Sequence, residues 1–170
     1  MHDFRRTARE LSSAMMPSRR APSDLGDWTA QHLGDHSVRK RMTMILRHVD
    51  LRGARVLDLG CANGVYTTRM SQLGAHAMGI DVEPIRLGSA QEFKHRHGAE
   101  DASFMLASAM SLPFADDTFD VVTLIEVIEH VEDDARTLLE VRRVLRDGGK
   151  VAIFAPNKLW PFESHGVHQE

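Results

Sequence analysis

Five short apolar segments are spaced along the chain, and longer stretches with the periodicity of amphipathic helices separate them. The segment DVVTLI at Asp120–Ile125 illustrates them, since it is an almost continuous apolar run. Runs of this kind and length are typical of strands that are buried on both faces of a sheet. On this pattern we predict strands at residues 56–60, 77–81, 103–107, 120–125 and 151–155.

The stretches between these segments predict helices, and several residues mark where the helices begin and end. Ser37 is a suitable N-cap, and Pro84 fits the first turn of a helix because its φ angle is already helical. Gly74 and Gly98 follow apolar-periodic stretches and are expected to end helices. The predicted helices are 37–49, 65–73, 84–97 and 133–146. In the last helix the residues expected to face the core are Ala135, Leu138, Val141 and Leu145.

Strand and helix alternate throughout, which favours a parallel sheet with right-handed crossovers and helices on both faces. We therefore predict an α/β fold, a Rossmann-like three-layer sandwich with a mostly parallel sheet. A chain of 170 residues is expected to form one domain with a sizeable core. Residues 1–25, rich in Ser, Pro and Arg without periodicity, are predicted to be a flexible tail, and residues 26–170 the domain.

Composition narrows the classes of function. The chain has a net charge of −3, so it lacks the overall basic surface that nucleic-acid-binding proteins use. It contains no apolar stretch long enough to span a membrane, and its N-terminus lacks the apolar region of a signal peptide. The single cysteine, Cys61, excludes an internal disulfide framework. A reducing, cytoplasmic setting is therefore expected.

The most informative motif is RVLDLGCANG at Arg55–Gly64, with Gly79-Ile80-Asp81 about twenty residues further on. A buried strand leads into a turn of small residues and a helix, and a second strand then ends in a carboxylate. This is the spacing of a βαβ nucleoside-binding unit, in which Asp81 accepts hydrogen bonds from ribose hydroxyls. The turn itself reads G-C-A-N-G, which is not the G-x-G-x-x-G order of dinucleotide-binding proteins.

The pattern Asp58-x-Gly60-x-Ala62-x-Gly64 resembles motif I of the class I S-adenosylmethionine-dependent methyltransferases. Ala62 stands where that family usually has its middle glycine. The motifs GIDVE, ASAMSLPF, FDVVTLIEVIEHV and LRDGGKVAIFAPN follow in the same order as in the branch that includes the ubiquinone- and menaquinone-biosynthesis methylases. The resemblance covers residues 55–157, and its strength lies in the order and spacing of several motifs rather than in one glycine turn.

This resemblance implies S-adenosyl-L-methionine as the cofactor and a small-molecule oxygen, nitrogen or carbon as the methyl acceptor. Asp58 would orient the turn or meet the ammonium group of the ligand, Asp81 would bind the ribose, and Val82 would lie against the adenine. Ser108 stands where the family often has an acidic residue that reads the adenine amino group. The expected cofactor site comprises Asp58, Gly60, Cys61, Ala62, Gly64, Asp81, Val82, Ser108, Ala109, Met110 and Glu126.

The residues after the fourth predicted strand leave two interpretations open. Glu126, Glu129 and His130 are spaced i, i+3 and i+4, so a helical turn would gather them on one side. Some relatives with this pattern are thought to place a divalent cation there. Alternatively, Glu126 lines the cofactor site and His130 is a general base or a packed helix-end residue. We expect no metal, and the predicted catalytic residues are Glu126, His130 and His165.

The resemblance also bears on completeness, because the family sheet continues with two strands beyond the fifth that this chain is too short to supply. A truncated piece, a naturally short relative and a half completed by another chain are all compatible with the sequence. The edge of strand five is expected to pair with a second chain, as in a homodimer, or to lie under Trp160 and Phe162. The alternative function is a cofactor-binding regulatory or partner-completed module without turnover. No nucleic-acid or membrane partner is expected.

Overall fold

The computed structural model describes residues 36–156. The chain divides into two compact units, Met1–Lys40 and Arg41–Glu170, and of the first unit only the beginning of helix α3 (His36–Leu46) is described. The predicted tail at 1–25 and the residues Trp160, Phe162 and His165 lie outside the described residues. The sheet and the site considered below belong to the second unit.

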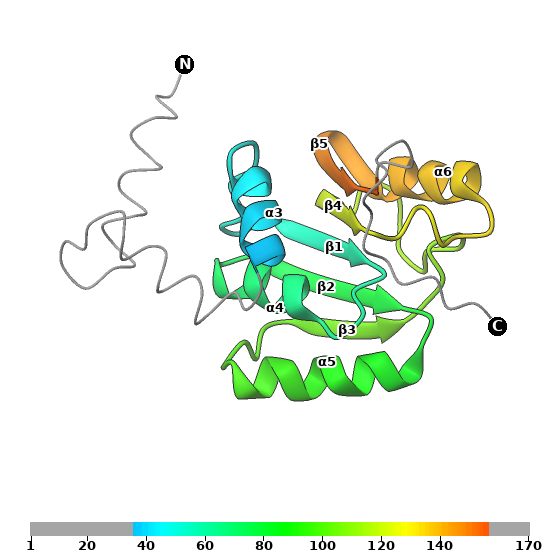
Figure 1. Ribbon diagram of the computed structural model, residues 1–170. Helices are drawn as coiled ribbons and strands as arrows, with labels where there is room; N and C mark the ends of the chain where they lie inside the picture. Colours follow the sequence, from blue (N-terminus) through cyan, green and yellow to red (C-terminus); the bar gives the residue numbers. More distant parts are fainter. Residues whose placement is uncertain (1–35, 157–170) are drawn as a thin grey trace, which may run out of the picture. The chain divides into compact units, whose positions relative to one another are not determined.

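A parallel sheet of five strands forms the centre of the second unit (Figure 1). The strands are β1 (Arg55–Leu59), β2 (His76–Asp81), β3 (Ser103–Leu106), β4 (Phe119–Ile125) and β5 (Leu145–Phe154). They pair in the order β3-β2-β1-β4-β5, and every pairing is parallel, which confirms the predicted α/β fold. The order reverses between β1 and β4, and open α/β sheets bind their ligands beyond the carboxyl ends of the strands at such a switch point.

The helices that connect these strands also lie where the sequence predicts them, with small shifts at their ends. They are α4 (Val65–Gln72), α5 (Pro84–Arg96) and α6 (Asp134–Val144). Pro84 stands at the start of α5, as expected. Helix α6 is capped by Asp133, whose side chain accepts a hydrogen bond from the Arg136 N–H at 2.8 Å. No helix within residues 36–156 has both the length and the apolar character needed to cross a membrane.

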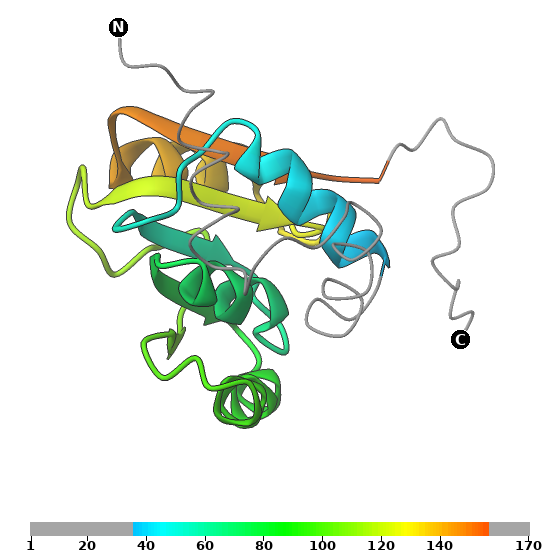
Figure 2. The same cartoon turned by 90° about the vertical axis from the view of Figure 1, so that its left-hand side faces the viewer.

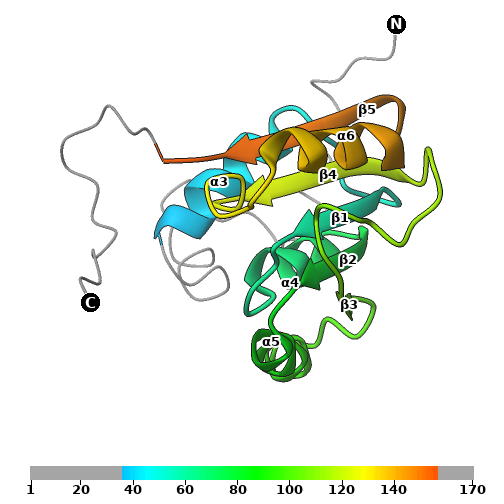
Figure 3. The ribbon, with the colours of Figure 1, turned by 90° about the vertical axis from the view of Figure 1, so that its right-hand side faces the viewer.

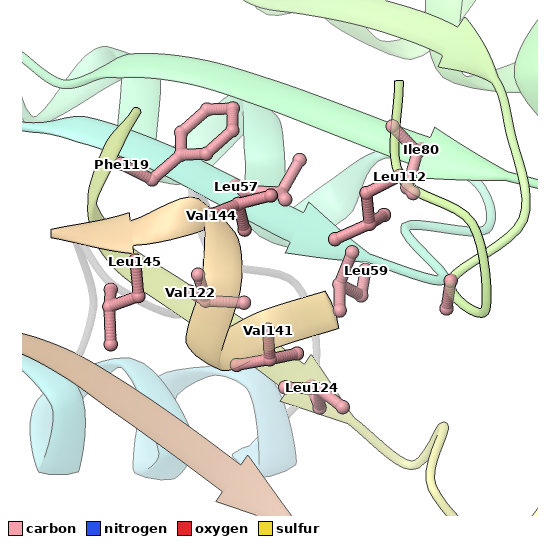
Figure 4. Close-up of a cluster of buried hydrophobic side chains, with 11 residues drawn as sticks. Leu57, Leu59, Ile80, Leu112, Phe119, Val122, Leu124, Val141, Val144 and Leu145 are labelled. Carbon is pink, nitrogen blue, oxygen red and sulfur yellow. The ribbon is translucent and has the colours of Figure 1, made fainter. Parts of the chain in front are cut away.

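The two faces of the sheet are covered by different helices because successive residues of a strand point to opposite sides. One face packs against α6 in a buried apolar cluster that includes Leu57, Leu59, Val122, Leu124, Val141 and Val144 (Figure 4). On the other face, Asp58 of β1 accepts hydrogen bonds from the hydroxyl groups of Thr123 in β4 and Thr67 in α4. The three-layer arrangement predicted from the sequence is therefore present.

Helix α6 presents a different face to the core from the predicted one. Val141 is buried as expected, but Leu138 is 42% exposed and Ala135 is exposed, so these two expectations were wrong. The helix instead buries Thr137, Glu140 and Val144. The physical reason is a polar contact: in this orientation the Glu140 carboxylate accepts a hydrogen bond from the backbone N–H of Leu112 at 2.8 Å. The apolar pattern of the sequence does not reveal this contact.

Strand β5 begins earlier than predicted and lies at an edge of the described sheet (Figures 2 and 3). Leu145, which the sequence placed on the inward face of the preceding helix, is its first residue and pairs with Phe119. The register then shifts, and residues 147–149, which lie between the predicted helix and the predicted strand, form an irregularity within β5. Val151 and Ile153 of this terminal strand are 42% and 46% exposed, so apolar side chains of β5 remain accessible.

The orientation of α6 can be tested by comparing two substitutions to alanine. Val144→Ala should lower the free energy of unfolding by about 1–3 kcal/mol, because it opens a cavity at a fully buried position. Leu138→Ala removes more apolar volume but from an exposed position, so its effect should stay within about 0.5 kcal/mol. Urea unfolding of both variants measures this. A larger loss for Leu138→Ala would contradict the observed orientation of the helix.

Candidate functional site

Three segments from different strands meet at the carboxyl edge of the sheet. They are the turn at 60–64 after β1, the residues around Asp81 at the end of β2, and the segment 126–130 after β4. The Cys61 N–H donates to the carbonyl of Ile80 at 2.8 Å, which joins the first two segments. A Cβ atom built on Gly60 would lie 2.6 Å from Cγ2 of Val127, so the third segment packs directly on the turn. The fold thus gathers the predicted site residues of these segments.

The turn at 60–64 uses left-handed backbone conformations. Gly60 and Gly64 have φ angles of 61° and 72°, and a Cβ at either position would also collide with neighbouring side chains. Ala62, between them, has a φ of 46°. This conformation is uncommon for residues other than glycine and costs about 1–2 kcal/mol. The structure therefore gives a physical reason why a glycine is the expected residue at position 62.

Asp81 fastens the turn to the end of β2. Its Oδ2 accepts a hydrogen bond from the Ala62 N–H at 2.9 Å, and its Oδ1 accepts one from the Glu83 N–H at 2.9 Å. The residue is 7% exposed. The carboxylate therefore orders both the turn and the beginning of α5. Val82, the next residue, is 64% exposed and presents an apolar side chain beside this carboxylate.

Asp58 lies beneath the turn and is 2% exposed. Its two carboxylate oxygens accept hydrogen bonds from the hydroxyl groups of Thr67 and Thr123, each at 2.7 Å. Burial raises the pKa of Asp58 to about 6, although the two hydroxyl groups offset part of the rise. This arrangement ties β1, α4 and β4 together directly below the turn, and it leaves no carboxylate oxygen of Asp58 without a partner.

Gly79 of β2 makes room for this packing. It pairs with Asp58 in the sheet register, and a Cβ built on it would lie 2.7 Å from the Thr67 hydroxyl and 2.8 Å from the Cys61 sulfur. The thiol of Cys61 is buried, and burial together with the negative charges of Asp58 and Asp81 raises its pKa. A neutral, buried thiol of this kind serves packing rather than nucleophilic chemistry.

The segment at 108–110 is held beside Asp81. The N–H of Ala107 donates to the Asp81 carbonyl at 3.1 Å, and the Ser108 hydroxyl accepts from the Met110 N–H at 3.2 Å. Ala109 is buried and Met110 is half-buried. The structure thus places the segment of Ser108, Ala109 and Met110 next to the end of β2.

The connection between β3 and β4, which carries this segment, contains no helix and is anchored by charged groups of α6. The Arg143 guanidinium donates to the carbonyls of Phe114 and Leu112, at 2.7 and 3.0 Å, and to Glu140 at 2.8 Å. Arg143 and the Leu112 N–H lower the pKa of Glu140 to about 2. The connection is therefore tied to α6 by an ionised pair rather than by apolar packing alone.

The segment after β4 does not form a helical turn of the kind that would gather its two glutamates and His130 on one side. Glu126 has a φ of 57°, and its N–H donates to the Phe154 carbonyl at 2.7 Å, so the chain changes direction immediately after the strand. Glu126, Glu129 and His130 therefore do not share one side of a helix. No group of three His, Cys, Asp or Glu side chains within residues 36–156 is arranged to hold a metal ion. The His130 side chain is exposed.

Glu126 forms an ion pair with Arg41 of α3, and Arg41 also donates to the Tyr66 hydroxyl at 3.2 Å. Both members of the pair are partly exposed. Arg41 and Tyr66 carry no signal in the sequence that marks them as site residues, because no local pattern reveals a pair 85 residues apart. Thr123 was also missed, although a polar residue within an otherwise apolar strand was a usable signal.

The comparisons with known proteins agree in pointing to methyltransferases. A family model described as a methyltransferase domain matches residues 57–153. A ubiquinone biosynthesis O-methyltransferase of Methylococcus capsulatus is 33% identical over 118 residues, which cover 69% of this chain and 50% of that protein. The chain thus spans about half the length of this relative.

Solved structures resemble the chain to a similar extent. The YcgJ protein from Bacillus subtilis has a TM-score of 0.65 and 28% identity, over 68% of this chain and 50% of that one. The [4+2]-cyclase SpnF has a TM-score of 0.64 and 28% identity, over 68% of this chain and 43% of that one. Both likenesses cover about two thirds of this chain and half or less of the other protein.

The strain at Ala62 predicts that Ala62→Gly will stabilise the protein by about 0.5–1 kcal/mol. Relief of the left-handed conformation exceeds the extra chain entropy that glycine adds to the unfolded state. The matched control is Ala54→Gly, at a position without a positive φ, where the same change should destabilise. Urea unfolding of both variants measures the effect, and equal losses for the two glycines would show that Ala62 is unstrained.

The buried carboxyl of Asp58 predicts a specific dependence of stability on pH. Its pKa rises from 3.8 to about 6 on folding, so the folded state holds the proton more tightly. Protonation of Asp58 therefore contributes to the free energy of unfolding. This contribution is fully present below about pH 4 and is lost as the pH rises through about 6. Asp58→Asn cannot titrate. The stability of the natural protein relative to this variant should fall by on the order of 2–3 kcal/mol between pH 4 and pH 6.5.

Urea unfolding at several pH values in this interval measures the difference between the two proteins. Asp101→Asn, at an exposed position, serves as the control, and its stability should follow that of the natural protein throughout. A constant difference between the natural protein and Asp58→Asn would mean that the carboxyl does not take up a proton in this range.

Proposed function

The chain belongs to the methyltransferase domain family, and on that premise we propose that it transfers a methyl group from S-adenosyl-L-methionine to a small-molecule acceptor. One observation carries this proposal: the Ala62 N–H donates to Asp81, so that the turn after β1 and the acid after β2 form a single unit. This unit lies at the carboxyl edge of the sheet, beside the switch point where such folds bind ligands.

Asp81 is proposed to bind the cofactor ribose. A carboxylate offers about four lone-pair positions, and the N–H groups of Ala62 and Glu83 occupy one on each oxygen. The remaining positions suit the two ribose hydroxyls, in charge-assisted hydrogen bonds. Val82 is proposed to lie against the adenine. Its exposure beside Asp81 supports this role, and the neighbouring segment 108–110 is proposed to line the rest of the purine.

The amino-acid end of the cofactor is proposed to lie over the backbone of Gly60, Cys61 and Gly64. Of the two roles open to Asp58, orientation of the turn is the better supported, since both of its oxygens already accept threonine hydroxyls. Glu126 lies at the end of the adjacent strand, where its pair with Arg41 offers both a cation and a carboxylate to a zwitterionic ligand. We keep Glu126 as a proposed cofactor contact for this reason.

The bound cofactor supplies a methyl group that its sulfonium makes electrophilic. The chain's own residues then have to orient an acceptor in line with that methyl group and exclude water, and no protein nucleophile is required. The matched relative is an O-methyltransferase by name, which favours oxygen as the accepting atom. A base is needed where the acceptor has to lose a proton. We propose three residues for that role: Glu126, His130 and His165. Of these, His130 has an exposed side chain.

A second candidate function is a cofactor-binding module that does not transfer methyl groups without a partner chain. The occurrence of a similar fold in a protein that is named as a cyclase supports it, since one fold can carry different functions. A second copy of the chain, paired through the exposed edge of β5, is the proposed partner in that case. The single cysteine, Cys61, supports a reducing, cytoplasmic setting for either function.

The cofactor proposal predicts that S-adenosylhomocysteine, the product form, will raise the melting temperature. A ligand at a hundredfold its dissociation constant stabilises the folded state by about 2.7 kcal/mol. Asp81→Asn should weaken binding at least tenfold in isothermal titration, because it removes the charge that the ribose hydroxyls are proposed to meet. Asp101→Asn is the control and should bind normally. Stabilisation by NADH but not by S-adenosylhomocysteine would contradict the proposal.

A parallel assay separates the two candidate functions. Methyl-labelled cofactor is incubated with the chain and a cell extract, and label in small molecules is measured. Transfer by the chain alone supports the enzyme, whereas cofactor binding without any transfer supports the module.

A further inference from the structure

Two buried carboxylates, Asp58 and Asp81, lie on the same face of the sheet beside the turn at 60–64. Asp58 of β1 pairs in the sheet register with Gly79 of β2, and Asp81 stands two positions beyond Gly79. Side chains two positions apart in a strand point to the same face, so both carboxylates are on the side that α4 covers. Asp58 is 2% exposed and Asp81 is 7% exposed. Negative charge is thus concentrated beside the turn.

The structure supplies hydrogen-bond donors to these carboxylates but no positive charge. The side chain of Asp58 accepts from two threonine hydroxyls and that of Asp81 from two backbone N–H groups, and neither forms an ion pair within residues 36–156. The guanidinium of Arg41, which reaches the end of β4, is engaged by Glu126 and by the Tyr66 hydroxyl. The buried negative charge is therefore left for a ligand to balance.

The titratable groups that interact with Asp58 are acids. Asp81 of β2 is negatively charged, whereas burial keeps the Cys61 thiol of the turn and the Tyr66 hydroxyl of α4 neutral by raising their pKa values. Strand β4 contributes only the hydroxyl of Thr123. Burial and the charge of Asp81 raise the pKa of Asp58 to about 6, although the threonine hydroxyls lower it. Without a ligand, Asp58 therefore holds a proton below about pH 6.

The chemical structure of the proposed cofactor places its sulfur close to these carboxylates. The sulfur joins the ribose, proposed to lie on Asp81, to the amino-acid end, proposed to lie over the backbone of the turn at 60–64. Since the Ala62 N–H of that turn donates to Asp81, the two anchoring points adjoin each other and the sulfur lies between them. This sulfur is positively charged in S-adenosylmethionine and neutral in S-adenosylhomocysteine, the product form.

We propose that Asp58 releases a proton to solvent when S-adenosylmethionine binds and takes one up again once methyl transfer has made the sulfur neutral, a role that rests on the proposed function. A positive charge beside two buried carboxylates favours the ionised form of the one that still holds a proton. Only the O–H bond of Asp58 changes in this exchange. A threonine hydroxyl can accept as well as donate a hydrogen bond, so Thr67 and Thr123 serve both states of the carboxyl.

This exchange makes the affinity for the two ligands depend differently on pH. Because binding of S-adenosylmethionine releases a proton, its affinity rises with pH until Asp58 is ionised in the free protein. The affinity for S-adenosylhomocysteine changes less, because its neutral sulfur gives the ionised carboxylate no counter-charge. Ionisation of Asp58 thus shifts the preference of the site towards the charged cofactor and away from the product.

The test compares the two ligands by isothermal titration between pH 5 and pH 6.5. The amino-acid ends of both ligands keep their charges in this interval, because α-carboxyl and α-amino groups titrate near 3.5 and 7.8. Buffers of different ionisation enthalpy give the number of protons released on binding. At pH 6, S-adenosylmethionine should release about half a proton per chain, since Asp58 is half protonated there, and S-adenosylhomocysteine clearly less. The ratio of the two affinities should shift towards S-adenosylmethionine by about threefold or more across the interval.

Three variants assign the proton to Asp58. Asp58→Asn cannot release a proton, so both ligands should release equal numbers and the affinity ratio should not depend on pH. The control Asp101→Asn, at an exposed position, should behave as the natural protein. Thr123→Val keeps the shape of the side chain but removes a hydroxyl that lowers the pKa of Asp58, so proton release should continue to higher pH. This shift is measurable even where Asp58→Asn does not fold.

Three results would overturn the proposal: equal proton release by the two ligands in the natural protein, a difference between the ligands that persists in Asp58→Asn, or an unchanged pH dependence in Thr123→Val. Each of them leaves the proposed function intact, because both ligands still bind. If neither ligand binds the natural protein, the proposed function itself fails, and with it the premise on which the role of Asp58 rests.

Discussion

The site depends on one constraint: the turn after β1 has to pass very close to the end of β2. Three features meet this constraint together. Asp58 holds the base of the turn through two threonine hydroxyls, Gly79 leaves space for Cys61 and Thr67, and Asp81 accepts the N–H of Ala62. Because the hydrogen bonds of Asp58 are short and buried and that of Asp81 is partly buried, the backbone of the turn has little freedom. A ligand laid over it meets an arrangement of groups that is already formed, which lowers the entropy lost on binding.

Much of the fold could be predicted from the sequence because its strands are buried on both faces. A parallel strand of this type leaves an uninterrupted apolar run, and Gly74 and Pro84 mark the adjoining helix ends. The wrong predictions share a different cause. The face of α6 is determined by Glu140 and the Leu112 N–H, and the segment after β4 by the left-handed conformation of Glu126. Neither the contact between distant residues nor that backbone conformation leaves a periodic signal in the sequence.

The candidate site likewise contains residues that the sequence predicts and contacts that it does not reveal. The proposed cofactor residues Gly60, Asp81 and Ser108 each lie within a few positions of a strand end, in motifs that the sequence itself displays. The pair of Arg41 and Glu126 joins residues 85 positions apart, so no local motif could reveal it. The sequence groups Glu126 and Glu129 in one acidic segment, and it predicts only Glu126 as a catalytic or cofactor-binding residue. The structure separates them, since one has a cation beside it and the other has no partner among the described residues.

The central claim is that the turn and Asp81 act as one binding unit for S-adenosyl-L-methionine. A crystal structure of the chain with S-adenosylhomocysteine tests it most directly. We predict both ribose hydroxyls within about 2.6–3.0 Å of the Asp81 carboxylate oxygens, in the range of charge-assisted hydrogen bonds. The hydrogen bond between Ala62 and Asp81 should be retained. A nucleoside bound elsewhere on the sheet, or a ribose held by residues other than Asp81, would contradict the account.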